Sequence, residues 1–216
     1  MQKINKRLET LSAFINSGEV ILDIGCDHGL LGIYLCLSKN IKVISSDINE
    51  KPLAKAKENI KKYNLENKIE TRLGNGLEVM SSDVNTIVIS GMGKETIIKI
   101  LKDIKKYHNV KKLVLSPNND FNQLRYEITK LGFKINRETM VLDHNKYYLI
   151  SEFVLGYEDI DYYFGKLDLN NDVVKKYYKY IYDKNLRIIN ELGDSDNIKK
   201  RSLMKENNYI KENISL

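Results

Sequence analysis

Short apolar runs alternate with amphipathic segments over the first 155 residues. The runs are rich in Val, Ile and Leu, as is typical of parallel strands buried on both faces. Between them, apolar residues recur at intervals of three and four, which predicts helices. Strands are expected at residues 20–24, 42–46, 69–73, 86–90 and 111–115, and helices at 5–16, 30–38, 51–63 and 121–131.

Two further extended segments, 133–142 and 147–155, flank the turn Asp143-His144-Asn145. Strands alternating with helices, followed by a hairpin, predict an α/β fold with a mostly parallel, Rossmann-like sheet and an antiparallel edge pair. Ligands of such sheets bind at the carboxyl ends of the strands. The glycine-rich turns of this chain all fall at that edge, which indicates one site.

After residue 156 the sequence pattern changes from alternating strands and helices to helices alone. A helix is expected over 171–192 and a second, weaker one after it, which together form a helical hairpin. We therefore expect two domains, 1–156 and 157–216. The hairpin is either a packing arm or a substrate-binding arm, and its sequence does not decide between them.

Composition limits the class of protein. The chain has 216 residues, 42% of them hydrophobic, enough for one α/β core with an appendage. No apolar stretch approaches the roughly 20 residues of a membrane span, and Cys26 and Cys36 match no metal or redox spacing. We expect a cytoplasmic monomer without a metal ion.

The net charge of +6 arises in residues 1–156, which hold 24 Lys and Arg against 18 Asp and Glu. Many enzymes are equally basic, so this charge is only weak support for a nucleic-acid partner.

The first predicted strand runs into a glycine turn at Asp23-Ile24-Gly25-Cys26-Asp27-His28-Gly29. Dinucleotide folds use Gly-x-Gly-x-x-Gly, whereas the glycines here are spaced Gly-x-x-x-Gly-x-x-Gly. Two carboxylates would repel a pyrophosphate and would suit a cationic ligand such as S-adenosylmethionine. The turn resembles motif I of the class I methyltransferases, with Asp27 in place of a glycine.

Two later turns add cofactor candidates. Asp47 ends the second strand, where a carboxylate accepts ribose hydroxyls, and Asn75 follows the third strand, where many methyltransferases contact adenine. Asp47 alone is equally compatible with NAD. The predicted S-adenosylmethionine site comprises Asp23, Gly25, Cys26, Asp47, Ile48, Asn75, Gly76 and Gly91.

The turn after the fourth strand reads Ser90-Gly91-Met92-Gly93. Enzymes that methylate exocyclic amines of bases carry adjacent prolines here, and this chain has none. Methylation of pyrimidine carbon 5 is also disfavoured, because no Pro-Cys pair lies at these turns.

Taken together, these segments resemble the bacterial TrmK-type tRNA (adenine-22-N1)-methyltransferases over about residues 4–155. The motifs that carry the resemblance are Lys6-Arg7-Leu8, Asp23 to His28, Leu73-Gly74-Asn75-Gly76-Leu77, Ser90 to Gly93, Pro117-Asn118 with Leu124-Arg125, and Lys146-Tyr147-Tyr148. Family members often have Asp at position 75 and Gly at position 94, where this chain has Asn75 and Lys94.

The resemblance implies methyl transfer from S-adenosylmethionine to adenine N1 of tRNA. It places Asp27, His28 and Met92 in the catalytic region. The residues expected to contact tRNA are Arg7, Lys94, Pro117, Asn118, Arg125, Lys146 and Tyr148. A class I methyltransferase for a small molecule or a protein, and a non-catalytic RNA-binding module, remain alternatives. A nicotinamide dehydrogenase fits least, because the glycine spacing and the acidic turn both oppose it.

Overall fold

A computed structural model of the chain describes residues 5–192 and 197–215. Seven strands form one sheet in the order β3-β2-β1-β4-β5-β7-β6. The first five strands pair in parallel, and β7 pairs antiparallel with β5 and β6. The strands are β1 (Val20–Ile24), β2 (Lys42–Asp47), β3 (Ile69–Leu73), β4 (Thr86–Met92), β5 (Lys112–Pro117), β6 (Phe133–Asp143) and β7 (Lys146–Leu155).

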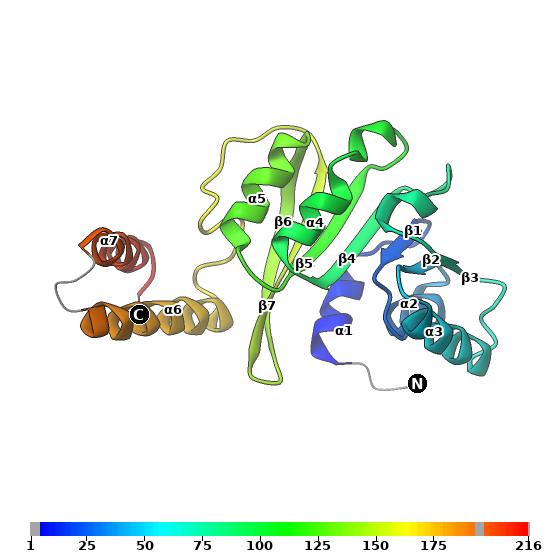
Figure 1. The fold of residues 1–216 in the computed structure, drawn as a ribbon, viewed down its shortest axis with the longest axis horizontal. Coiled ribbons are helices and arrows are strands. Elements are labelled where there is room, and N and C mark those ends of the chain that lie inside the picture. Colours follow the sequence, from blue (N-terminus) through cyan, green and yellow to red (C-terminus); the bar gives the residue numbers. More distant parts are fainter. Residues whose placement is uncertain (1–4, 193–196, 216) are drawn as a thin grey trace. The chain divides into compact units, whose positions relative to one another are not determined.

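Helices cover both faces of this sheet (Figure 1). The helices of the first unit are α1 (Lys6–Ala13), α2 (Leu30–Lys39), α3 (Glu50–Lys62), α4 (Lys94–Leu101) and α5 (Phe121–Lys130). Alternate strand residues enter two separate cores: Val88 packs with α1, α2 and α3, while Ile87 and Ile89 pack with α4 and α5. Because side chains alternate across a strand, each buried strand supplies both cores. The expected mostly parallel sheet with an antiparallel edge is confirmed.

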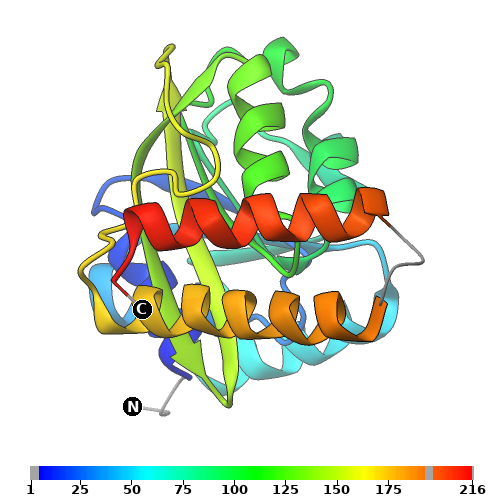
Figure 2. The same ribbon diagram turned by 90° about the vertical axis from the view of Figure 1, so that its left-hand side faces the viewer.

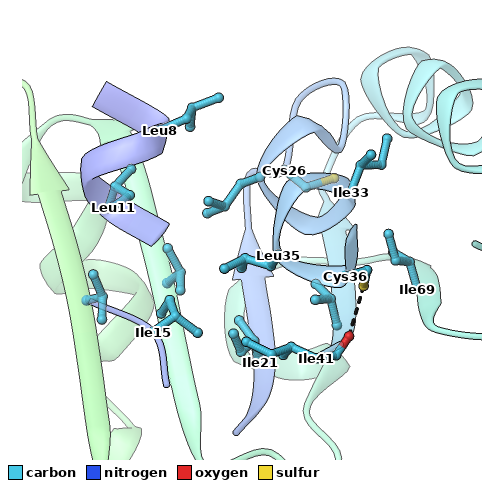
Figure 3. Close-up of a cluster of buried hydrophobic side chains, with 14 of the residues drawn as sticks. Leu8, Leu11, Ile15, Ile21, Cys26, Ile33, Leu35, Cys36, Ile41 and Ile69 are labelled. Atoms are coloured by element: carbon cyan, nitrogen blue, oxygen red, sulfur yellow. Dashed lines mark hydrogen bonds between the residues drawn. The ribbon is translucent and has the colours of Figure 1, made fainter. Parts of the chain in front are cut away.

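The core on the α1, α2 and α3 side contains both cysteines (Figure 3). The thiol of Cys36 donates to the carbonyl oxygen of Ile41 at 2.9 Å. Both cysteines are free and buried, so they act as packing residues in this core.

The predicted ends of β1 and β3 match the observed ones, and the other element ends differ by at most three residues, with the difference most relevant to function at β4. The strand was expected to end at Ser90, but it continues through a β-bulge to Met92, which pairs with Pro117. Gly91 provides the positive φ of 79° that the bulge requires. The bulge re-aims the backbone at the edge where ligands bind such sheets.

The described chain divides into one compact unit up to Lys166 and a second from Leu167 onward. From its sequence, the boundary was placed at residue 156. Residues 157–166 instead pack on the first unit: the guanidinium of Arg125 donates to the carbonyl oxygens of Tyr162 and Tyr163. Composition alone does not reveal such backbone contacts.

The second unit is a pair of antiparallel helices, α6 (Asp172–Leu192) and α7 (Asn197–Asn213), as Figure 2 shows. The buried amide of Asn185 donates to the side chain of Asn207 at 3.1 Å and to that of Glu206 at 2.9 Å. A buried polar contact of this kind sets the register between two helices. None of the described helices is long and apolar enough to cross a membrane.

Candidate active site

The first glycine turn is hydrogen-bonded to the neighbouring strand β2. The N–H groups of Gly25 and Cys26 both donate to the carbonyl oxygen of Ser46, at 2.8 and 2.9 Å. Gly25 and Gly29 have positive φ angles of 75° and 70°, a conformation that glycine adopts without strain. The backbone therefore turns sharply at the carboxyl end of β1 and presents the start of α2.

Two buried carboxylates lie beneath this turn. Asp23 is 4% exposed and Asp47 is 9% exposed. Burial and the negative charge of Asp47 raise the pKa of Asp23 to about 7. Asp47 is held by the N–H of Asn49, which donates to its Oδ1 at 2.9 Å. This concentration of negative charge favours a cationic ligand.

The Cys26 thiol lies in the same turn. Burial, and then the charges of Asp23 and Asp47, raise its pKa well above its ordinary value. It stays protonated at neutral pH and so is no nucleophile. Cys26 thus remains a predicted member of the cofactor site, as a wall residue and not as a nucleophile.

The turn after β3 lies next to the end of β2, because the N–H of Gly74 donates to the carbonyl oxygen of Asp47 at 3.0 Å. Asn75 is exposed there, and the 62% exposed Ile48 extends from the end of β2. Gly76 has a φ of 57°, and a Cβ on it would lie 3.1 Å from Ile100. These three predicted cofactor residues therefore gather on the β2–β3 side of the glycine turn.

Met92 bridges the glycine turn and the end of β4. Its methyl group lies against Gly25 and would collide with any side chain at that position. The backbone beside it is held by Asn118, whose side chain donates to the carbonyl oxygen of Gly91 at 2.7 Å and whose N–H donates to that of Met92 at 2.9 Å. The ends of β1, β4 and β5, with Pro117, thus form one continuous surface.

The first helix brings Arg7 to the same surface. Its guanidinium lies 5.0 Å from the ring centroid of Tyr148, and its Nη1 would lie 3.3 Å from a Cβ on Gly91. The backbone N–H of Arg7 donates to Oδ2 of Asp143 at 3.4 Å. Asp143 and the exposed Lys146 belong to the hairpin that joins β6 and β7.

Asp27 and His28 are exposed at the tip of the glycine turn. Asp27 has a φ of 51°, and its Oδ1 lies 3.6 Å from Nε2 of His28. The carbonyl oxygen of His28 accepts a hydrogen bond from the side chain of Asn59 at 2.9 Å. The turn thus fixes the backbone, while both side chains face outward.

Two of the expected tRNA-contact residues are held inside the protein. Arg125 is fully buried, and its Nε donates to Glu138 Oε1 at 2.9 Å. The ammonium of Lys94 contacts the side chains of Gln123 at 2.7 Å and Glu95 at 2.5 Å. The expected phosphate contact at Arg125 is therefore wrong, and that at Lys94 is not supported by its position. A sequence shows charge but not the partner that neutralises it.

Several residues that organise this edge gave no sequence signal. Asp143 ties the first helix to the hairpin, and Asn119 Oδ1 accepts from the N–H of Lys94 at 3.0 Å. No group of three His, Cys, Asp or Glu side chains in the described part of the chain is placed to hold a metal ion.

This geometry agrees with comparisons with known proteins. A family model described as "Methyltransferase domain" matches residues 4–151. The tRNA (adenine(22)-N(1))-methyltransferase of Bacillus subtilis (strain 168) is 32% identical over 163 residues, which are 74% of this chain and 68% of that protein. The chain belongs to the TrmK family of class I methyltransferases.

Solved structures of similar proteins extend this likeness over both units. Streptococcus pneumoniae Sp1610 in complex with S-adenosyl-L-methionine has a TM-score of 0.90 and 30% identity, covering 99% of this chain and 100% of that chain. TrmK of M. capricolum in complex with S-adenosyl-homocysteine has a TM-score of 0.87 and 27% identity, covering 97% and 96%. The expected class I methyltransferase fold of this TrmK-family chain is confirmed, and its C-terminal helices fall within the matched length.

Proposed function

We propose that this TrmK-family protein transfers the methyl group of S-adenosyl-L-methionine to N1 of adenine 22 in tRNA. The observation that carries the proposal is the likeness to the Bacillus subtilis enzyme, which covers 74% of this chain. The match to the methyltransferase-domain model, residues 4–151, spans both the acidic glycine turn and the Gly-Met-Gly turn. The buried pair Asp23 and Asp47 makes that region suited to a cationic cofactor.

The residues at the ends of β1, β2 and β3 fit the cofactor. Asp47 accepts the ribose hydroxyls, as acids at this position do in open α/β sheets. Asp23 supplies negative charge for the amino and sulfonium groups, and Gly25 lets the backbone approach. Asn75 contacts the adenine, with Cys26, Ile48, Gly76 and Gly91 completing the walls. The cofactor, when bound, supplies an electrophilic methyl group.

The target base enters on the β4 and β5 side. N1 lies on the pairing edge of adenine, so the base must leave its stack before it can react. Met92 and Tyr148 flank this side of the edge and pack against the flipped ring. The lone pair of N1 lies in the ring plane and would bond to the methyl carbon as the bond from that carbon to sulfur breaks and S-adenosyl-homocysteine leaves, so positioning provides much of the catalysis.

Charge stabilisation is assigned to the tip of the glycine turn. Methylation leaves the adenine ring cationic, and a carboxylate nearby stabilises that developing charge. Asp27 provides the carboxylate, or accepts a proton from the amino group. His28, 3.6 Å from Asp27, orients this carboxylate or the base.

The tRNA backbone is held by groups at the rim. Arg7 and Lys146 provide the positive charges for phosphates, and Pro117 and Asn118 shape the surface between them. Arg125 and Lys94 are not part of this contact set, because their charged groups are bound within the protein.

The decisive experiment is methyl transfer from labelled S-adenosyl-L-methionine to unmodified tRNA, followed by mapping of the modified nucleoside. N1-methyladenosine at position 22 is the expected product. Methylation at another tRNA atom would retain the methyltransferase and contradict the position. Cofactor binding without tRNA methylation would favour a methyltransferase of a small molecule or a protein, and tRNA binding without cofactor binding would favour an RNA-binding module.

A further inference from the structure

The first unit carries an open hollow beside α5. Its volume is about 420 Å³, and its walls include Asn122, Gln123, Tyr126, Tyr162 and Tyr163. That volume lies within the range of small-ligand pockets, roughly 300–1,000 Å³. Asn122, Gln123 and Tyr126 are exposed, so the hollow is open to solvent and admits a group that stays attached to a larger molecule.

Buried contacts hold the shape of this hollow. The guanidinium of Arg125 donates to the carbonyl oxygens of Tyr162 and Tyr163 at 2.9 and 2.8 Å, and its Nε pairs with Glu138. Arg125 and the Glu138 side chain are both fully buried. The segment that carries the two tyrosines is therefore fixed against α5 before any ligand arrives.

The walls have the chemistry of a nucleobase site. Tyr126 is 44% exposed, and its ring meets that of Tyr162 edge to face at 5.5 Å between centroids. The ammonium of the exposed Lys130 lies 3.9 Å from the Tyr126 centroid, so a base that stacks on that face displaces it. The amide side chains of Asn122 and Gln123 lie beside these rings. Unpaired bases bind proteins by stacking on aromatic rings and by hydrogen bonds along their edges. Asp161 in the wall and the Lys130 ammonium over the Tyr126 ring offset one another, which favours a neutral base over a phosphate as the occupant.

One residue joins the hollow to the substrate side of the active site. The ammonium of Lys94 donates to Oε1 of Gln123 at 2.7 Å. Only Gly93 separates Lys94 from Met92 in the chain, and the N–H of Lys94 is held by Asn119 from the β5–α5 turn. The hollow thus begins where the surface expected to take the target base ends.

We propose that this hollow binds the nucleobase adjacent to the target adenine in the tRNA. The inference rests on the proposed function. A target base that leaves its stack to expose N1 removes the stacking partner of its neighbour. The tyrosine rings replace that partner, so the enzyme holds two consecutive unstacked bases and fixes the register of the strand.

The test uses Tyr126→Ala in the full chain, with Tyr157→Ala as a matched control. Tyr157 is 85% exposed and lies outside the hollow. Stacking on one aromatic side chain changes affinity by about five-fold or more. We expect Tyr126→Ala to raise the KM for tRNA by that factor with kcat and the Kd of S-adenosyl-L-methionine unchanged, and Tyr126→Phe to recover most of the affinity.

A second measurement identifies the occupant. Substrate tRNAs with an abasic site immediately before or immediately after the target adenine are compared with wild-type enzyme and with Tyr126→Ala. We expect one of the two abasic sites to weaken binding to wild type and to have a much smaller effect in the variant, which is the non-additivity of a direct contact.

Additive effects at both positions, or an unchanged KM in Tyr126→Ala, would overturn the inference while leaving the proposed function intact. Failure of the wild-type enzyme to methylate tRNA would instead overturn the proposed function, and the inference with it.

Discussion

The methyl group of Met92 lies against Gly25, so the end of β4 and the turn after β1 meet at one point. Gly25 is predicted to bind the cofactor and Met92 to pack on the target base. Their contact places the two halves of the proposed site side by side. A side chain at residue 25 would therefore have to displace the methyl group of Met92.

Gly25→Ala is expected to weaken binding of S-adenosyl-L-methionine by at least about ten-fold, because a Cβ would collide with the methyl group of Met92 and displace that side chain at the edge where the cofactor is proposed to bind. Gly18→Ala is the matched control, since Gly18 has a similar positive φ of 84° with nothing near its Cβ position. Both variants should lose about 1 kcal/mol from backbone strain. Isothermal titration calorimetry measures the cofactor affinity, and equal affinities in the two variants would contradict the packing argument.

Asp23 predicts a pH dependence of cofactor binding. Its pKa of about 7 in the ligand-free protein means that the carboxyl is partly protonated at neutral pH, whereas a cationic ligand favours the ionised form. Affinity for S-adenosyl-L-methionine should therefore rise as the pH rises through 7, with release of a proton. Titrations in two buffers of different ionisation enthalpy detect that proton. Asp23→Asn should bind weakly with a flat pH profile, while Asp83→Asn, an exposed control, should behave as wild type.

The same group affects stability without the cofactor. Folding raises the pKa of the Asp23 carboxyl from its ordinary value of 3.8 to about 7. The contribution of this group to the free energy of unfolding is therefore complete below pH 4 and is lost as the pH rises through 7. Denaturant unfolding at pH 5 and pH 8 should show Asp23→Asn gaining stability relative to wild type by roughly 2–4 kcal/mol at the higher pH. No change in that difference between the two pH values would contradict the raised pKa.

Arg125 is predicted to stabilise the folded protein through its buried pair with Glu138. Arg125→Met leaves the buried Glu138 carboxylate without its counter-charge, and removal of one partner of a buried pair costs about 3–5 kcal/mol. Lys55→Met, which breaks the exposed pair between Lys55 and Glu58, should cost less than about 1 kcal/mol. Denaturant unfolding measures both values. A stable Arg125→Met variant with selectively weakened tRNA binding would restore the phosphate contact first expected from the sequence.

Arg7 is predicted to contact a phosphate. Arg7→Gln should raise the KM for tRNA and lower by about one the slope of log affinity against log salt concentration, with unchanged binding of S-adenosyl-L-methionine. Lys61→Gln removes an exposed charge at the far end of α3 and should alter neither quantity. If the slope of log affinity against log salt concentration were unchanged in Arg7→Gln, the contact of the Arg7 guanidinium with Tyr148 would serve only to anchor the first helix.

Much of the fold was predictable because strands and helices repeat at different intervals and because parallel strands share one carboxyl edge. That rule alone placed Asp23 and Asp47 together, on neighbouring strands that pair in parallel. The bulge at Gly91 and the contact between Met92 and Gly25 depend on how β4 pairs with β5. No local pattern carries that information.

The sequence by itself determined the order of elements, the acidic glycine turn and the family motifs, because these depend on residues close together in the chain. Only the tertiary structure decided which charges are available. Arg125 and Arg7 look alike in sequence, yet one pairs with Glu138 inside the protein and the other lies at the rim beside Tyr148. Their partners are separated from them by 13 and 141 residues of chain (138 − 125 and 148 − 7), and whether a charge is neutralised depends on distance in space.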